Sequence, residues 1–234
     1  MRFFYGDLER KNLKNDVSYY HILPTMTNRK IDAVLFDLDG VLINSFECWY
    51  QAFSKMLRAY GKGEISREEF EEKCWGPDLR HNLAALNLGR DAARRCVREQ
   101  LNLIELIELF PDVREVLHRI KEEYKLKVGL VTNTPRENVD RIFEHFKLSN
   151  HFDVILTGND VKRGKPDAEI VVKACERLNV KPEHAILVGD TETDYQAGKA
   201  AGCFVVGVGA KSAGDVQIEK LDELFTKPFS LKLF

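Results

Sequence analysis

Hydrophobic positions in the second half of the chain follow two alternating patterns. Short apolar runs, typical of buried parallel strands, occur at residues 128–131, 154–156, 185–188 and 204–208. Segments with apolar residues at helical spacing lie between and after them, at residues 113–123, from 132–135 to about 146, and at 166–178, 195–201 and 215–225. Alternation of this kind predicts an α/β fold, a doubly wound parallel sheet with helices on both faces.

The first half of the chain has one strand signal followed by a long helical block. Residues 33–36 form an apolar run that leads directly into Asp37 and Asp39. From residue 46 to 109 the apolar spacing is helical throughout, and it predicts helices at 46–60, from Ser66 onward, at 79–86 and at 90–109. We therefore expect an inserted, all-helical small domain at 46–109 and a core made of residues 31–45 and 110–234.

The first 30 residues show no sustained period and are expected to be an extension of the core. Met26 lies just before the first strand, so translation starting there is one interpretation. The other is an arm that packs on the core through its aromatic residues.

Composition narrows the class of protein. Lys+Arg 35 against Asp+Glu 37 leave a net charge of −2, which gives no basic face for nucleic acid. The five cysteines form no C-x-x-C pair, so they indicate neither a disulfide framework nor a zinc site. No apolar run is long enough to span a membrane and no secretory signal is visible, so we expect a cytoplasmic protein without membrane partners.

Candidate chemistry lies where the predicted strands end. Asp37 and Asp39 follow the first strand, at the edge where open α/β sheets bind ligands, and Gly40 gives the backbone room to turn. Two close carboxylates repel each other unless a cation lies between them. Asp190 and Asp194 follow a later strand and converge with the first pair if the two strands are neighbours. Oxygen ligands of this kind suit Mg²⁺.

Hydrogen-bond donors and a basic loop accompany these acids. Thr132, Asn133 and Thr134 lie between a strand and a helix and can donate to an anion, although a threonine there can also simply cap the helix. Lys165 belongs to a basic turn before a helix whose first position would be Pro166, and it is suited either to hold a phosphate or to face solvent.

Together these motifs resemble the signature of the haloacid dehalogenase superfamily. The matching stretches are D-L-D-G-V (37–41), V-T-N-T (131–134), R-G-K-P (163–166) and G-D-T-E-T-D (189–194). The resemblance covers about residues 31 to 210 and is strongest to the phosphoglycolate phosphatase-like and β-phosphoglucomutase-like branch. It implies a Rossmann-like core and a helical cap that closes over the active site.

The resemblance also implies a role for each matching residue. Asp37 would be the nucleophile and Asp39 the general acid and base. Mg²⁺ would be bound by Asp37, Asp190 and the backbone carbonyl of Asp39, with Asp194 orienting the metal shell. The phosphoryl group would be held by Thr132, Lys165 and the backbone of Asn133.

This assignment predicts a phosphatase for a small phosphorylated metabolite, with phosphoglycolate as one candidate. A carboxylate nucleophile splits a very slow displacement into two steps through an aspartyl phosphate. A phosphomutase of the same family, a 2-haloacid dehalogenase and a non-catalytic phospho-receiver remain alternatives. The second acid favours phosphate chemistry over dehalogenation, and the long insertion argues against a receiver.

One loop of the predicted cap is a candidate for substrate selection. Trp75-Gly76-Pro77 joins two cap helices, and we expect Arg80 just after it to reach down to an anionic group of the substrate. A surface position for Arg80 is the alternative, and His81 and Asn82 are rival contacts.

Overall fold

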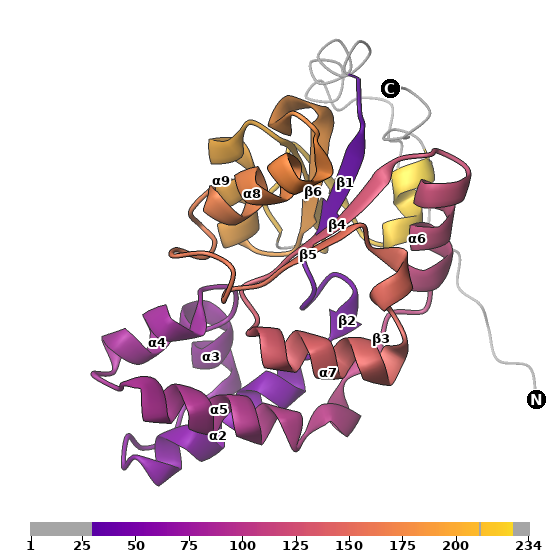
Figure 1. Cartoon of the computed structure of the whole chain (residues 1–234). Helices are drawn as coiled ribbons and strands as arrows, with labels where there is room; N and C mark the ends of the chain where they lie inside the picture. Colours follow the sequence, from indigo (N-terminus) through magenta and orange to yellow (C-terminus); the bar gives the residue numbers. More distant parts are fainter. Residues whose placement is uncertain (1–29, 211, 227–234) are drawn as a thin grey trace, which may run out of the picture.

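A computed structural model describes residues 30–210 and 212–226 of the protein. Its centre is one sheet of six parallel strands in the order β5-β4-β1-β6-β7-β8 (Figure 1). The strands are β1 (Ala33–Phe36), β4 (Lys127–Val131), β5 (Val154–Leu156), β6 (Ala185–Gly189), β7 (Phe204–Val208) and β8 (Val216–Ile218). The doubly wound α/β fold expected from the sequence is confirmed. The predicted N-terminal extension, apart from Lys30, lies outside the described residues.

Helices cover both faces of the sheet. On one face lie α6 (Val113–Glu122) and α7 (Arg136–Phe146), and on the other lie α8 (Glu169–Leu178) and α9 (Glu192–Ala201) (Figure 1). Successive residues of β1 alternate between the two hydrophobic clusters, with Val34 in one and Ala33 in the other. All residues of β1 are fully buried, which explains why this strand reads as an unbroken apolar run.

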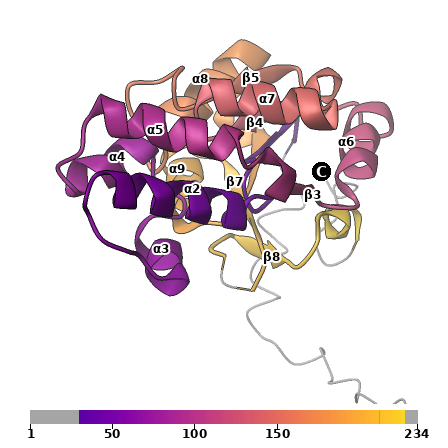
Figure 2. The ribbon, with the colours of Figure 1, turned by 90° about the horizontal axis from the view of Figure 1, so that it is seen from below.

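The helical insertion lies between β1 and β4 and forms a separate group below the sheet in Figure 1; in Figure 2, seen from below, its helices lie side by side. Its helices are α2 (Phe46–Ala59), α3 (Arg67–Lys73), α4 (Leu79–Ala85) and α5 (Arg90–Leu101). It has its own hydrophobic cluster of buried residues, Ala52, Phe53, Met56, Leu57, Phe70, Leu83, Ala92 and Cys96. We call this insertion the cap, because its loop between α3 and α4 reaches the carboxyl ends of the core strands.

The last cap helix is shorter than expected. The helix predicted for 90–109 ends at Leu101 and is followed by a 3-10 turn, η1 (Ile104–Leu106), and by β3 (Glu108–Leu109). Strand β3 pairs antiparallel with β2 (Ile43–Asn44), so a two-stranded ribbon lies where the chain leaves and re-enters the core. The residues of η1 and β3 take this path because Ile104 is buried in the core cluster.

Other predicted boundaries also change. The closing helix expected at 215–225 is wrong: β8 extends the sheet there by pairing with β7, and only the 3-10 helix η4 (Leu221–Phe225) follows. The helix expected from Pro166 begins at Glu169, so Pro166 lies outside it. Two further 3-10 turns are η2 (Ser149–His151) and η3 (Pro182–His184). Among the described residues, no helix combines the length and apolar character that a membrane crossing requires.

Candidate active site

The site forms where three neighbouring strands end. Phe36, the last residue of β1, is in register with Leu130 of β4 and Val188 of β6. The residues that follow these strands therefore meet at one edge of the sheet, as expected for an α/β crevice. Asp37 leaves β1 there, with its backbone N–H donating to the carbonyl of Val188 at 2.9 Å.

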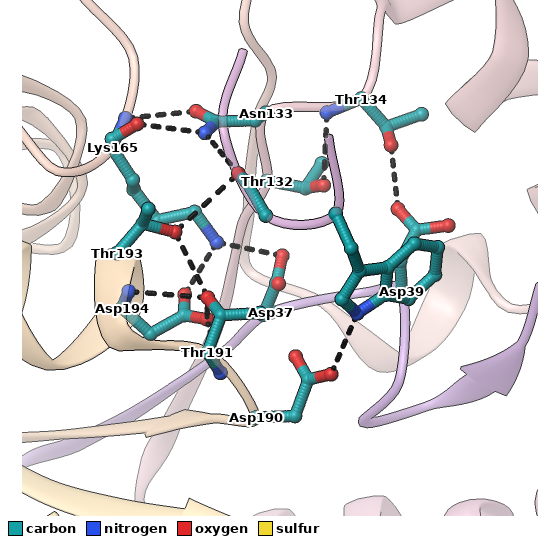
Figure 3. Close-up of polar contacts among 12 residues, drawn as sticks. Asp37, Asp39, Thr132, Asn133, Thr134, Lys165, Asp190, Thr191, Thr193 and Asp194 are labelled. Atoms are coloured by element: carbon teal, nitrogen blue, oxygen red, sulfur yellow. Dashed lines mark hydrogen bonds and ion pairs between the residues drawn. The ribbon is translucent and has the colours of Figure 1, made fainter. Parts of the chain in front are cut away.

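Lys165 is the centre of the charged group (Figure 3). Its side chain is almost completely buried, and its Nζ lies 2.8 Å from Asp37 Oδ1 and 2.5 Å from Asp194 Oδ1. Burial alone would lower the pKa of Lys165, but the Asp194 and Asp37 carboxylates outweigh that effect and raise it. The ammonium group therefore stays charged between two carboxylates.

Asn133 fixes the loop that carries this lysine. Its Oδ1 accepts from the backbone N–H of Lys165 at 2.8 Å, and its Nδ2 donates to the Lys165 carbonyl at 2.9 Å. The same Nδ2 donates to the carbonyl of Gly76 in the cap at 2.9 Å. One side chain thus joins the end of β4, the lysine loop and the cap. The nearby Thr132 is buried, and its hydroxyl accepts from the backbone N–H of Thr134 at 3.1 Å.

Asp39 is held from three sides. Thr134 Oγ1 donates to its Oδ2 at 2.5 Å, Trp49 Nε1 donates to its Oδ1 at 3.0 Å, and Ser45 Oγ donates to the same oxygen. Trp49 belongs to cap helix α2, whereas Thr134 follows core strand β4. The orientation of Asp39 therefore depends on both parts of the molecule.

Asp194 is fully buried, and both of its carboxylate oxygens accept hydrogen bonds from other residues. Besides its bond to Lys165, its Oδ2 accepts from the backbone N–H of Thr191, in a capping box at the start of α9. The capping box explains why the helix begins at Glu192 rather than near Tyr195.

Asp190, by contrast, keeps one carboxylate oxygen unused. Its Oδ2 accepts from the cap residue Trp75 through Nε1 at 3.2 Å, while its Oδ1 is buried and makes no hydrogen bond to the described residues. Gly40 makes room for this carboxylate: it has a φ of +76°, and a Cβ there would lie 2.0 Å from Asp190 Oδ2.

The three acids crowd one another in a way that suits a divalent cation. Asp37, Asp190 and Asp194 each offer an oxygen within 4.8 Å of the others. Burial and the charge of Asp194 raise the pKa of Asp37 to about 7, despite the opposing effect of Lys165. Burial, together with Asp194 and Asp37, raises the pKa of Asp190 well above its usual range. The unused oxygen of Asp190, the repulsion and the all-oxygen donors fit Mg²⁺.

The cavity above these groups is small and has two unlike walls. It has a volume of about 70 Å³. The core contributes carboxylates and hydroxyls, whereas the cap contributes mainly apolar side chains. The cap residues that line the cavity are Trp49, Phe53, Phe70, Cys74, Trp75, Gly76, Pro77, Leu79 and Asn82.

The sequence predicted that Arg80 would reach the substrate, but Arg80 does not line this cavity. It lies in an adjoining groove of about 920 Å³ between the cap and α7. Its guanidinium pairs with Asp78, the N-cap residue of α4, at 2.5 Å, and donates to the carbonyl of Gly158 at 3.1 Å. The Arg80 side chain is directed away from the cavity because it pairs with the carboxylate of Asp78, two residues before it in the chain. Asn82, a rival contact, does line the cavity, and His81 does not.

The sequence therefore located most of the charged groups in the site but missed the two indole donors. Asp37, Asp39, Thr132, Asn133, Lys165, Asp190 and Asp194 come together as expected. Trp49 was missed because its helical spacing indicates packing, and Trp75 because its place in the loop between two cap helices does not show where its N–H points.

Comparison with known proteins identifies the family. A family model described as haloacid dehalogenase-like hydrolase matches residues 34–208. The chain belongs to this family. Its relatives in the family include a phosphorylated carbohydrates phosphatase of Thermotoga maritima, 33% identical over 181 residues, which cover 74% of this chain and 82% of that protein. They also include pyrophosphatase PpaX of Bacillus mycoides, 33% identical over 193 residues, which cover 81% and 89%.

A solved structure from the same family supports the predicted branch. The crystal structure of β-phosphoglucomutase from Clostridium difficile superposes with a TM-score of 0.74 at 25% identity, covering 83% of this chain and 93% of that one. The resemblance stated from the four motifs is thus confirmed, as is the expectation of a phosphatase of this family.

Proposed function

We propose that the protein is an Mg²⁺-dependent phosphatase that hydrolyses a small phosphomonoester through an aspartyl phosphate on Asp37. The observation that carries the proposal is the buried Lys165 ammonium, held 2.8 Å from Asp37 at the meeting point of three strand ends. A cation in this position can neutralise the oxygens of a phosphoryl group that the carboxylate attacks.

In the first step, a carboxylate oxygen of Asp37 forms a bond to phosphorus while the bond from phosphorus to the leaving oxygen breaks. Lys165, Thr132 and the backbone N–H of Asn133 hold the phosphoryl oxygens. Asp39 gives its proton to the leaving alcohol. When bound by Asp37, Asp190 and the backbone carbonyl of Asp39, Mg²⁺ supplies further charge neutralisation.

In the second step, Asp39 takes a proton from water, the water oxygen bonds to phosphorus, and the bond to Asp37 breaks. This releases inorganic phosphate and restores both acids. The donors Trp49, Thr134 and Ser45 keep Asp39 facing the reacting group in both steps. Asp194, bonded to Lys165 and to the start of α9, orients the site without contacting substrate.

The cap wall favours a neutral leaving group. Within the described part of the chain, the cap brings no charged side chain into the cavity. Phosphoglycolate would need a cationic partner for its carboxylate, and Arg80, the residue assigned to that role from the sequence, lies in the adjoining groove. We therefore favour the phosphate ester of a compact, uncharged alcohol.

Among the cap residues that line the cavity, Asn82 has a side-chain acceptor, its Oδ1, that makes no hydrogen bond to the described residues. It is 7% exposed, its Nδ2 donates to the carbonyl of Cys74 at 2.8 Å, and its Oδ1 is buried without a hydrogen-bond partner among the described residues. A hydroxyl of the leaving alcohol would satisfy that oxygen. Asn82→Leu should then lower kcat/KM about tenfold for polyol phosphates and leave p-nitrophenyl phosphate unaffected. Equal losses on both esters would contradict this role.

Two measurements test the proposed function: release of inorganic phosphate, and detection of the covalent intermediate on Asp37. The full chain should release phosphate from p-nitrophenyl phosphate with Mg²⁺, lose that activity in EDTA and regain it when Mg²⁺ is restored. Asp39→Asn should slow both steps, and quenched samples should carry one phosphoryl group on the peptide that contains Asp37. Phosphate release that chelation leaves intact, or a phosphoryl group on another residue, would contradict the mechanism.

The same assay separates the alternatives. A phosphomutase would return the phosphoryl group to a sugar phosphate rather than to water, so little free phosphate would appear. A haloacid dehalogenase would release halide from 2-haloacids without Mg²⁺, and a phospho-receiver would keep the phosphoryl group without turnover.

A further inference from the structure

Trp75 makes a hydrogen bond from the cap to a candidate metal ligand of the core. Its Nε1 donates to Asp190 Oδ2 at 3.2 Å, which leaves Oδ1 buried and without a hydrogen bond to the described residues. In Figure 3 the carboxylate of Asp190 is directed toward Asp37, and the two residues offer oxygens within 4.8 Å of each other. The indole thus determines which oxygen of Asp190 is left for a cation beside Asp37.

The ring of Trp75 is fixed on the cap side. Its centroid lies 5.3 Å from that of Phe46 and 6.4 Å from that of Phe70. Aromatic packing of this kind holds the ring in place while its N–H stays free to donate. The indole is therefore part of the packing of the cap, whereas Asp190 belongs to the core.

The next residue docks the same loop on the core. The carbonyl of Gly76 accepts from Asn133 Nδ2 at 2.9 Å and from Thr193 Oγ1 at 3.4 Å. A Cβ at Gly76 would lie 3.1 Å from Thr191 Cγ2, and its φ is +94°, so the close approach of the loop depends on glycine. These bonds hold the loop over Asp190 in the described arrangement of cap and core.

We propose that Trp75 is a positioning residue that links cap closure to Mg²⁺ binding by orienting Asp190. The proposal rests on the metal site of the proposed function. A hydrogen bond to one oxygen of a ligating carboxylate restricts its rotation and directs the other oxygen to the ion. By linkage, a cap position that improves the metal site is itself favoured when the metal binds.

The test uses Trp75→Phe, which keeps an aromatic ring in the packed position and removes only the donor. Mg²⁺ binding to the full chain without substrate, measured by calorimetry, should weaken about tenfold in this variant. Trp49→Phe is the matched control, because it removes the cap bond to Asp39 and keeps the bond to Asp190. Its Mg²⁺ affinity should stay within about twofold of the original.

Fluorescence gives a second readout. The chain has two tryptophans, so Trp75 is the sole indole in Trp49→Phe, and Mg²⁺ alone should change its emission. Asp190→Asn should abolish that change.

Wild-type affinity in Trp75→Phe, or equal weakening in both tryptophan variants, would overturn the role of Trp75 and leave the phosphatase proposal standing. Failure of the unmodified protein to bind Mg²⁺ would overturn both.

Discussion

The core wall and the cap wall of the cavity are built on different principles. On the core wall, charged groups lie at strand ends and neutralise one another, as the buried Lys165 does between Asp37 and Asp194. On the cap wall, aromatic rings pack together and only their polar edges reach the core, as Trp49 and Trp75 do. The core wall is fixed by the sheet, whereas the cap wall is fixed by the packing of its own small cluster.

This difference assigns separate tasks to the two walls. Under the proposed function, we expect a charged site supported by six strands to keep its geometry with little dependence on the leaving group. A wall of apolar rings selects a leaving group by shape and by the few polar edges it presents. Changes in the core wall should therefore affect chemistry, and changes in the cap wall should affect stability of the cap and choice of ester.

The largest effect is expected for Asp37→Asn. Loss of the proposed nucleophile should lower kcat by a factor on the order of 10³ or more, because an amide cannot form the covalent intermediate. The folded structure should persist, since Asp194 still pairs with Lys165. Turnover of p-nitrophenyl phosphate and the circular dichroism spectrum check both statements. Retained turnover would contradict the assignment of the core wall.

The second largest effect is expected for Phe70→Ala, which should disrupt the packing of the cap wall. Phe70 is buried, with ring contacts to Phe46, Tyr50, Phe53 and Trp75. Truncation should cost about 3–5 kcal/mol of unfolding free energy, measured in urea, and the cap should melt before the core.

Tyr60→Ala is the control for this change, because Tyr60 is an aromatic residue of the same insertion that is 40% exposed. It should alter stability by less than about 0.5 kcal/mol. A single cooperative transition at the original midpoint in Phe70→Ala would show that the cap cluster contributes little.

Charge crowding on the core wall should appear as a pH dependence of stability in EDTA. Burial and Asp194 raise the pKa of Asp37 to about 7, whereas the unfolded value is about 3.9. Between these values the folded state binds more protons, so the free energy of unfolding should fall as pH rises from 4 to 8.

Asp37→Asn removes this titration and sharpens the test. Relative to the variant, the original protein should lose on the order of 2–4 kcal/mol over that pH range, by urea unfolding. Saturating Mg²⁺ should reduce the difference, since the cation relieves the repulsion. If stability depends on pH in the same way in both proteins, the pH dependence does not come from the raised pKa of Asp37.

The smallest effect is expected for Arg80→Ala. The Arg80 side chain is 54% exposed and pairs with Asp78 outside the cavity. Because Arg80 lies outside the cavity and its charge is partly screened by solvent, kcat/KM should change by less than about threefold for acidic and neutral esters alike. A loss confined to acidic esters would return Arg80 to the role that the sequence suggested.

Sequence patterns predicted the core wall well, for a physical reason. Apolar runs mark buried strands, and the topology of an α/β sheet brings their carboxyl ends together, so Asp37, Thr132 and Asp190 could be placed at one edge. The cap wall was less predictable. The spacing that puts Trp49 in a packed helix does not reveal that its N–H reaches Asp39, and the sequence does not show that Asp78 captures Arg80.

Element ends were missed where tertiary contacts override local preference. Residues after Leu101 leave the helix because Ile104 is buried in the core cluster. Residues 216–218 form a strand because β7 offers an open edge to pair with. Neither contact has a local signal in the sequence.

The pairing of β1 has a consequence for how the chain folds during synthesis. Ala33 pairs with Lys127 on one side and with Ala185 on the other, so the central strand finds its neighbours only after most of the chain has been made. Closing such long loops before any sheet contact forms is slow. Until β4 and β6 have been synthesised, the apolar strand β1 stays unpaired, and exposed unpaired strands favour aggregation. The cap, whose contacts are local, is free to fold first, and early cap formation would shorten the search by bringing β1 and β4 together.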